Sequence, residues 1–319
     1  MGQNRFASSP PSARYSLLRH SPRSGRHCLT TPSQSPVMPR SPLVEREQVS
    51  MMIGGRRAIT LIEQARPLAL RAYDQIPMKA DDLLFQARFI APYLAHQHVA
   101  FVGDYDSTSA LLGLLGTRGT PLPATMLVLD FDERVLASVQ ALALRYGFAD
   151  RLTVRRYNVF DPLPQDLLGQ YDWFYTNPPY GSCNNGESAR LFITRGCELT
   201  HGGGRGCIIL PDDPRRRWAQ QAMLATQQFL TEHYWLVREK FDEMHHYHLD
   251  DDRDLASSLL IAEHVPDAYG AHRRLPYAGR HVATTEIPQF YGRSVLPPYP
   301  RYIACGGREA AASSRRNVG

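Results

Sequence analysis

The chain has 319 residues, 43% of them hydrophobic, and this length is enough to bury the core of one or two domains. It contains no apolar run near the roughly 18 residues that a membrane-spanning helix requires, so we expect a soluble protein with no membrane partner. The five cysteines, Cys28, Cys183, Cys197, Cys207 and Cys305, form no CxxC pair. This pattern favours free thiols in a reducing cytoplasm over a disulfide framework or a zinc site.

The formal net charge of +5 is located in the first 50 residues, which hold seven Arg, two Glu and neither Lys nor Asp. The remaining 29 basic and 29 acidic residues balance one another. Binding to nucleic-acid phosphates depends on a concentrated basic surface. The bulk charge therefore gives no support for a nucleic-acid partner.

The first segment also differs from the rest in composition, with ten Ser and seven Pro among its 50 residues and no sustained apolar period. Such a segment does not offset its ordering entropy, so we predict disorder over residues 1–52. Its Arg and Ser content resembles a transit peptide, and a translated extension upstream of a start at Met51 or Met52 is equally open. Residues 308–319 are predicted to be a second loose tail.

Apolar residues recur at helical spacing over residues 58–65 and again over residues 83–94, and we expect order to begin near Arg56. A polar turn, Tyr-Asp-Gln-Ile-Pro-Met at residues 73–78, lies between these two helices. We interpret residues 53–97 as a helical preface that packs on the following domain or covers its mouth.

From residue 98 to residue 265, apolar strands alternate with helical patterns. The predicted strands cover residues 99–102, 126–129, 152–157, 173–176, 207–210, 234–238 and 255–261, and the predicted helices residues 110–115, 134–146, 187–199 and 218–233. This alternation predicts an α/β fold: a Rossmann-like, doubly wound, mainly parallel sheet of seven strands with helices on both faces.

Polar residues follow the predicted strands where each strand ends. They are Gly103-Asp104-Tyr105-Asp106, Asp130 and Asp132, Asn158 and Asp161, Asn177, and Asp212 and Asp213. Sheets of this kind bind ligands beyond the carboxyl ends of their strands. Asp130, 27 residues after Gly103, has the position that holds ribose hydroxyls in Rossmann-like sites. Asp161 suits either a contact to an adenine amino group or a cap for the Asp161-Pro162 turn.

The first of these turns has one Gly and two Asp, whereas a pyrophosphate needs a glycine-rich loop and a helix N-terminus without nearby anions. Adjacent carboxylates repel a phosphate and attract a sulfonium or an ammonium ion. We therefore expect an adenosyl sulfonium compound as the cofactor, in place of NAD or ATP.

The fourth predicted strand runs directly into Asn177-Pro178-Pro179-Tyr180. Two prolines fix φ and remove two backbone donors, so the strand ends in a rigid, open turn. Such a turn presents the Asn177 amide and the Pro178 carbonyl beside the Tyr180 ring, which suits an amine whose N–H groups are held while its lone pair attacks. The alternative is a turn that only ends the strand.

Transfer from a sulfonium to an aliphatic amine requires a base, because such an amine, with a pKa of about 10.4, is protonated at neutral pH. We predict that Asp106 removes this proton and that Asp104 orients the acceptor or the amine of the donor. The alternative for both acids is a structural role at a helix start that Ser107 or Thr108 caps.

These motifs resemble two groups of transferases. Asn-Pro-Pro-Tyr resembles motif IV of S-adenosylmethionine-dependent amino-group methyltransferases. The segments 101–106, 129–134, 161–164 and 73–78 together resemble the branched-chain polyamine synthases, over roughly residues 70–265. In that family, aminopropyl groups move from decarboxylated S-adenosylmethionine to the internal nitrogen of spermidine. The resemblance implies a class I methyltransferase-like fold, and Asp106 aligns with the acid to which the family assigns proton removal from the acceptor.

The chain departs from the family at two motif positions. Tyr105 stands where the family usually has the middle acid of Gly-Asp-Asp-Asp, and Asn177 stands where Asp is common. We also expect that residues 1–50 do not form the N-terminal winged-helix domain of archaeal members. These differences leave the acceptor amine open more than the fold.

A second polar cluster, residues 243–252, contains three His and four acids. A metal site is one reading, a solvated turn between two strands is another, and the one we prefer is an acidic rim for a polycationic acceptor. We predict acceptor contacts at Asp74, Gln75, Tyr105, Tyr247 and Asp250, and no metal ligands. We predict donor contacts at Gly103, Asp130, Asp132, Asn158, Asp161 and Pro178.

Three functions remain open from the sequence. The favoured one is aminopropyl transfer to a small-molecule polyamine, and the others are N-methylation of an exocyclic or protein amino group and non-catalytic binding of a polyamine or sulfonium. A base-modifying enzyme needs a target-recognition module, and the roughly 55 residues after Val265 are few for one. The Pro- and Tyr-rich residues 266–307 are predicted either to wrap the sheet edge or to form a homodimer contact.

Overall fold

The computed structural model describes residues 42–249, 254–266, 274–291, 302–303 and 309–310. The chain divides into residues 1–42 and residues 43–319, and apart from Pro42 every element below belongs to the second unit. The disorder predicted for residues 1–41 lies outside the described residues.

A seven-stranded sheet is the centre of the second unit, and its strand order is β4-β3-β2-β5-β6-β8-β7. The strands are β2 (His98–Val102), β3 (Thr125–Asp130), β4 (Leu152–Arg156), β5 (Tyr171–Thr176), β6 (Thr200–Pro211), β7 (Trp235–His246) and β8 (Ala256–His264). Strands β2 to β6 pair in parallel, whereas β8 is antiparallel to both β6 and β7. The predicted Rossmann-like, mainly parallel sheet is confirmed.

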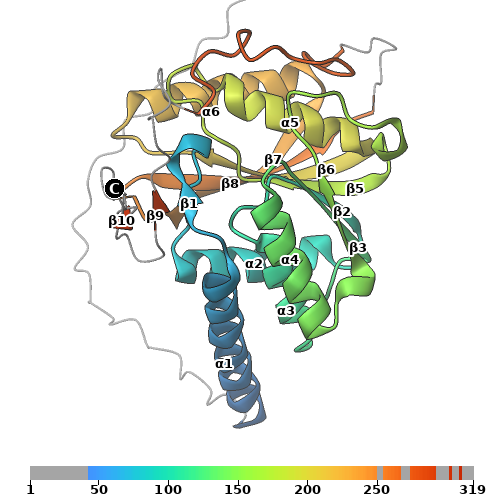
Figure 1. Ribbon diagram of the computed structural model, residues 1–319, viewed down its shortest axis with the longest axis vertical. Helices are drawn as coiled ribbons and strands as arrows, with labels where there is room; N and C mark the ends of the chain where they lie inside the picture. Colours follow the sequence, from blue (N-terminus) through green and yellow to red (C-terminus); the bar gives the residue numbers. More distant parts are fainter. Residues whose placement is uncertain (1–41, 250–253, 267–273, 292–301, 304–308, 311–319) are drawn as a thin grey trace, which may run out of the picture. The chain divides into compact units, whose positions relative to one another are not determined.

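Helices cover both faces of this sheet (Figure 1). One face packs against α1 (Pro42–Ala65), α2 (Ala80–Leu94), α3 (Thr108–Gly116) and α4 (Glu133–Tyr146), and the other against α5 (Glu187–Leu199) and α6 (Arg217–Glu232). Short elements are β1 (Ala69–Leu70), β9 (Tyr302–Ile303), β10 (Glu309–Ala310) and the 3-10 turns η1 (Arg71–Tyr73), η2 (Ala149–Arg151) and η3 (Gln165–Leu167). Strands β1, β9 and β10 form a separate small sheet.

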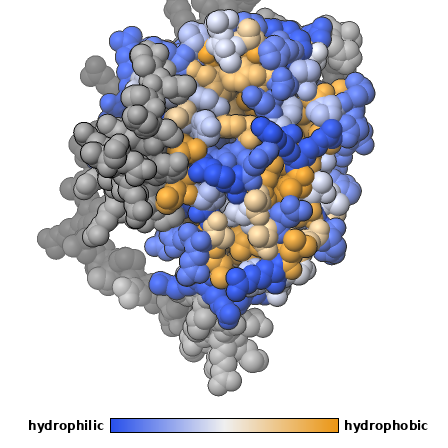
Figure 2. All heavy atoms as spheres, viewed as in Figure 1, coloured by the Kyte–Doolittle hydropathy of each residue, from blue (hydrophilic) through white to orange (hydrophobic). Residues whose placement is uncertain are grey.

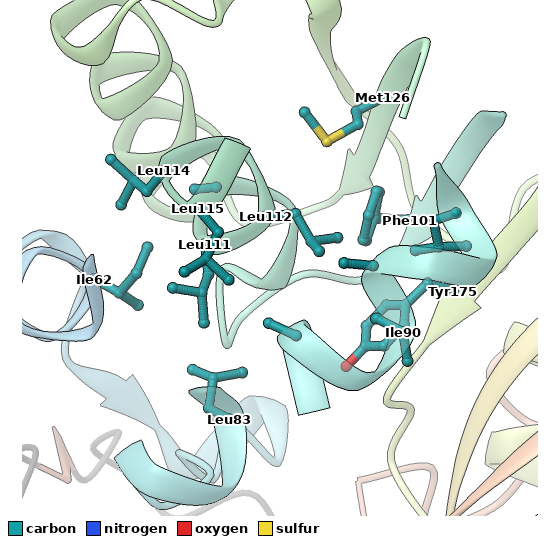
Figure 3. Close-up of a cluster of buried hydrophobic side chains, with 14 of the residues drawn as sticks. Ile62, Leu83, Ile90, Phe101, Leu111, Leu112, Leu114, Leu115, Met126 and Tyr175 are labelled. Carbon is teal, nitrogen blue, oxygen red and sulfur yellow. The ribbon is translucent and has the colours of Figure 1, made fainter. Parts of the chain in front are cut away.

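The two faces follow from the alternation of side chains along each strand. In β2, Val99 and Phe101 belong to the core cluster on the α1–α4 face, while Ala100 and Val102 belong to the cluster on the α5 face. Figure 3 shows side chains of α1, α2 and α3 meeting those of β2 and β5, among them Ile62, Leu83, Ile90, Leu111, Phe101 and Tyr175. Strand β2 is thus buried on both sides, as expected for a central strand of a parallel sheet.

Three predicted boundaries are corrected. Helix α1 begins at Pro42, so residues 42–52 are helical and do not belong to a disordered segment; a first-turn proline needs no N–H and has a φ suited to a helix. Strand β7 continues past the predicted end at residue 238 to His246, and its last residues, His245 and His246, pair with Ser257 and Ala256 of β8. The first four residues of the polar cluster thus belong to a strand. Glu309 and Ala310, placed in a loose tail, pair with β9.

The segment 274–291 packs against the α5 face of the sheet, where Val282, Ile287 and Phe290 join the core cluster. Arg195 of α5 is fully buried beneath it. Its guanidinium donates to the carbonyls of Val159, Tyr277 and Arg280 at 2.9, 3.0 and 3.0 Å, and to Glu198 at 2.7 Å. One cation thus satisfies backbone groups of the C-terminal extension and of the segment after β4.

The surface supplies no evidence of a membrane span. None of the helices in the described ranges is long and apolar enough to cross a bilayer. Figure 2 shows hydrophobic residues in several separate groups between hydrophilic ones on the face viewed in Figure 1. Scattered exposed apolar residues of this kind are ordinary for a folded protein.

We expect Arg195→Leu to lower the free energy of unfolding by about 3 kcal/mol, because three carbonyls and a carboxylate lose a buried donor. Urea unfolding measures this change. Arg156→Leu is the control, since Arg156 forms an exposed pair with Glu133 at 2.8 Å and its removal is expected to change stability by no more than about 0.5 kcal/mol. Equal effects of the two substitutions would contradict the role of Arg195.

Candidate active site

A pocket of about 920 Å³, counted to its open mouth, lies where β2, β3 and β5 end. Its walls come from residues 103–106 after β2, from Asp130 and Phe131 at the end of β3, and from residues 177–180 after β5. Residues 73–76 and the single residues Tyr247 and Tyr291 complete the walls. Its position beyond the carboxyl ends of the strands is that of a small-molecule site in a doubly wound sheet.

The turn after β2 is built around Gly103 and Asp104. Gly103 has a φ of +72°, and a Cβ there would lie 3.1 Å from Phe192, so glycine suits this position on both counts. The Asp104 carboxylate accepts hydrogen bonds from the backbone N–H of Thr108 at 2.8 Å, from the N–H of Ser109 and from the Ser109 hydroxyl. It therefore supports the start of α3, and contact of Asp104 with a substrate stays a prediction.

Asp106 is 5% exposed and both of its oxygens are held. Oδ1 accepts from the Arg66 guanidinium and from the Met78 N–H, each at 3.0 Å, and Oδ2 accepts from the Asn177 amide at 3.0 Å. Three distant parts of the chain thus fix one carboxylate. This geometry leaves lone-pair capacity on Oδ2 for one further donor.

Opposing effects act on the ionisation of Asp106. Burial raises its pKa above the ordinary value, while the charge of Arg66 and the Met78 and Asn177 hydrogen bonds act in the opposite direction. The sequence analysis did not identify Arg66, whose only signal is a cation between the last residue of α1 and Pro67. The guanidinium also lies 5.5 Å from the centre of the Tyr105 ring.

Asp130 ends β3 and lines the pocket. Its two oxygens accept the backbone N–H groups of Asp104 and Asp132 at 3.0 and 2.9 Å. Burial nevertheless raises the pKa of Asp130 to about 6. The predicted ribose contact stays a prediction, and the position of Asp130 at the strand end is compatible with it.

Asp132 and Gln75 connect the β3 turn with the preface. Asp132 caps α4 through the N–H of Arg134, and it also accepts from the Arg134 guanidinium and from the Gln75 amide at 2.8 Å. Burial opposes ionisation here, but these hydrogen bonds outweigh it and lower the pKa of Asp132. Gln75 also accepts from the N–H of Leu70 at 2.9 Å. Gln75 lines the pocket, and Asp132 lies behind its wall.

In the turn after β5, the side chain of Asn177 is bonded within the protein, and its predicted contact with an amine stays a prediction. Asn177 donates to Asp106, and its Oδ1 accepts from the Tyr180 hydroxyl at 3.4 Å. The Tyr180 hydroxyl also contacts that of Tyr247, which lies 2.8 Å from Ser257. Pro178 lines the pocket together with these residues.

The remaining residues predicted to contact a ligand differ in whether they line the pocket. Asp74 and Tyr105 line the pocket, and the Tyr105 hydroxyl donates to the Pro67 carbonyl at 3.2 Å. Asn158 and Asp161 do not line it, because the Asn158 side chain accepts from the Phe160 N–H and the exposed Asp161 carboxylate lies 3.0 Å from His281. Their donor contacts therefore have no support from their positions. Asp250 lies outside the described residues.

Three aromatic rings from separate segments lie together in the pocket wall. The Tyr73 ring lies 4.8 Å from that of Phe131 and 6.2 Å from that of Tyr291, measured between centroids. Neither Phe131 nor Tyr291 was among the predicted site residues. The acid-rich turn around Phe131 indicated it indirectly, whereas nothing in the Pro- and Tyr-rich extension distinguished Tyr291 from its other tyrosines.

The charged residues of the pocket wall have one sign. Asp74, Asp104, Asp106 and Asp130 line it, and among the described residues of the lining there is no Lys, Arg or His. Seven tyrosines and two phenylalanines supply aromatic faces in the same wall. Carboxylates and aromatic faces both attract cations. The pocket therefore suits a positively charged ligand with a flat apolar part.

Comparison with known sequences places these features in a family. The family described as "Branched-chain polyamine synthase A C-terminal domain" matches residues 56–269. An uncharacterized protein of Methanocaldococcus jannaschii is 27% identical over 172 residues, which are 54% of this chain and 39% of that protein. An N(4)-bis(aminopropyl)spermidine synthase of Thermococcus kodakarensis is 32% identical over 111 residues, 35% of this chain and 29% of that enzyme. The chain thus matches less than half the length of these curated relatives.

Among solved structures, the branched-chain polyamine synthase of Thermus thermophilus, in complex with N4-aminopropylspermidine and 5'-methylthioadenosine, is similar in fold. The TM-score is 0.57 at 20% identity, over 72% of this chain and 69% of that one. This likeness agrees with the class I methyltransferase-like sheet described above.

Asp130 gives a prediction for stability against pH. Its folded-state pKa of about 6 exceeds the ordinary 3.8, so the folded state binds more protons than the unfolded state between these values, and stability falls as the pH rises through this window. Between about pH 4.5 and 7.5 we expect a loss of about 2 kcal/mol that Asp130→Asn does not show. Urea unfolding of both proteins at the two pH values measures it, and parallel losses would contradict it.

Proposed function

The chain belongs to the branched-chain polyamine synthase family, because its residues 56–269 match the C-terminal domain of that family, and on that premise we propose that it transfers an aminopropyl group. The donor is decarboxylated S-adenosylmethionine and the acceptor is an amine nitrogen of a polyamine. The observation on which this proposal rests is the sign of the pocket wall, where every charged residue is an aspartate. Intact S-adenosylmethionine has a carboxylate that these residues would repel. The decarboxylated donor has only positive charges.

The reaction is a direct displacement. The lone pair of the acceptor nitrogen attacks the aminopropyl carbon bound to the sulfonium, the C–S bond breaks, and its electron pair returns to sulfur, leaving neutral 5'-methylthioadenosine. The leaving thioether needs no acid, so the protein has to free the amine of one proton and hold the two reactants in line.

Asp106 is suited to accept that proton. Burial raises its pKa, which makes it a stronger base than an exposed carboxylate, and the charge of Arg66 favours the ionised form that a base requires. Asn177 holds Oδ2 from one side. The acceptor ammonium then pairs with Oδ2 and loses its proton there.

The donor fits the part of the pocket next to β3. Asp130 is placed at the strand end for the ribose hydroxyls, and Phe131 with Tyr291 supplies aromatic faces for the adenine ring, with their centroids 6.5 Å apart. Asp74, Tyr105 and Tyr247 also line the pocket, and we place the ammonium groups of the acceptor beside them. We place this reaction in the cytoplasm, in accord with the unpaired pattern of cysteines.

N-methylation of an amino group is the second candidate, and the Asn177-Pro178-Pro179-Tyr180 turn favours it. Asn177 and Pro178 both line the pocket beside Tyr180. A methyl donor keeps its amino-acid carboxylate, however, and the pocket wall has no cation to receive it. We therefore rank aminopropyl transfer first.

Turnover with decarboxylated and with intact S-adenosylmethionine, each against spermidine and against adenine-containing DNA, tests the proposal. We expect product from the decarboxylated donor with spermidine alone. Methylated DNA would identify a methyltransferase, and binding of donor and spermidine without any product would identify a non-catalytic binder.

Asp106→Asn tests the assigned base. We expect kcat to fall at least about 100-fold, the usual scale of positioned base catalysis, while calorimetry finds the donor still bound. Asp172→Asn is the control, because Asp172 lies at the start of β5 and holds the His98 N–H at 2.7 Å, outside the pocket wall. A near-native rate for Asp106→Asn would remove Asp106 from this role.

A further inference from the structure

A continuous chain of five hydrogen bonds runs from a buried histidine to Asp106. It crosses the carboxyl-end edge of the sheet from β7 to β2 and links strands that are not neighbours. Its members, called here the hydrogen-bond chain, are His245, Ser257, Tyr247, Tyr180, Asn177 and Asp106. His245 and Ser257 are fully buried and lie opposite one another in β7 and β8.

The direction of this chain follows from the end at Asp106. An ionised carboxylate only accepts hydrogen bonds, so the atom of Asn177 that lies 3.0 Å from Oδ2 is the amide nitrogen. The amide oxygen of Asn177 then faces Tyr180 and also only accepts. The Tyr180 hydroxyl, 3.4 Å away, is therefore the donor.

The same argument continues to the other end. Because the Tyr180 proton is directed to Asn177, the Tyr180 oxygen accepts from the Tyr247 hydroxyl. The Tyr247 oxygen then accepts from Ser257 at 2.8 Å. With its own proton directed to Tyr247, the Ser257 oxygen accepts from Nδ1 of His245 at 3.0 Å. Nδ1 of His245 has to be protonated.

The second nitrogen of His245 agrees with this assignment. Nε2 is buried and has no hydrogen-bond partner among the described residues. A proton on Nε2 would be a buried donor without an acceptor, which is rarer in proteins than an unfilled lone pair. Burial also lowers the pKa of His245 to about 3, so the ring is neutral at pH 7.

We infer that His245 is a positioning residue: its Nδ1–H tautomer is the one that completes the hydrogen-bond chain, and it thereby supports the orientation of the Asn177 amide toward Asp106. Neither Asn177 nor Tyr180 touches His245, so the effect passes through Ser257 and Tyr247. Ser257 also contacts Tyr180, and Tyr247 also contacts Asn177, so these side chains are cross-linked. Oδ1 of Asn177 retains a second lone pair for an N–H of the acceptor. The consequence for catalysis rests on the proposed function, whereas the tautomer rests on the contacts alone.

Nitrogen NMR of the free protein, labelled with ¹⁵N in histidine, tests the tautomer. At pH 7 we expect a pyrrole-like Nδ1 and a pyridine-like Nε2 for His245, whose signals are identified by their loss in His245→Asn. The reverse pattern, or a charged ring, would overturn the inference. This measurement uses neither donor nor acceptor, so its result does not depend on the proposed reaction.

Two adjacent serines of β8 test the catalytic consequence. Both are fully buried, but Ser257 belongs to the hydrogen-bond chain while Ser258 donates to Asp212 at 2.6 Å, outside the pocket wall. We expect Ser257→Ala to lower kcat about tenfold at unchanged KM for the donor. Ser258→Ala is expected to leave kcat unchanged. Equal rates for the two variants would contradict the inference.

Substitutions of His245 complete the test. An asparagine amide nitrogen occupies nearly the place of Nδ1, so we expect His245→Asn to keep kcat within about threefold of the unchanged protein. His245→Leu removes the donor and is expected to lose about tenfold. If Asn and Leu lower kcat alike, the role of His245 is packing and the inference fails. If the unchanged protein turns over no donor, the proposed function fails while the tautomer result still stands.

Discussion

Burial of an ionised carboxylate is the constraint on which the site depends. Asp106 is almost entirely withdrawn from water, and a buried charge is tolerated only with an opposite charge and hydrogen-bond donors around it. Arg66 at the end of α1, the Met78 backbone and Asn177 after β5 supply them. The helical preface is therefore part of the site, because its Arg66 neutralises the group that we assign as the base.

The aspartates in and behind the pocket wall have different roles. Asp104 and Asp132 receive backbone N–H groups at the starts of α3 and α4, which is the structural alternative that the sequence left open for such acids. Asp106 receives its donors from distant segments instead, and Asp74 lies in the pocket wall. Position at a strand end thus identified the acids, but it did not show which of them stabilise a helix start and which are placed to contact a ligand.

The sheet was predictable because most of its apolar strands are separated by amphipathic helices between residue 98 and residue 265. Asp106 and Asn177 were predictable because each follows a strand directly. Arg66 and Tyr291 were not, since they enter the site from α1 and from the C-terminal extension through packing that has no local pattern. The length of β7 was missed because its polar end is paired with β8 and is not solvated as a turn.

Tyr291 lies beyond residues 56–269, the part of the chain that the family shares. Its ring nevertheless forms one wall of the pocket, and the extension that delivers it is anchored by Arg195. Substitutions in this extension can therefore change this part of the pocket wall without altering the contacts of Asp106. Ligand preference can thus differ between relatives through changes in this one segment, while the residues around Asp106 stay the same.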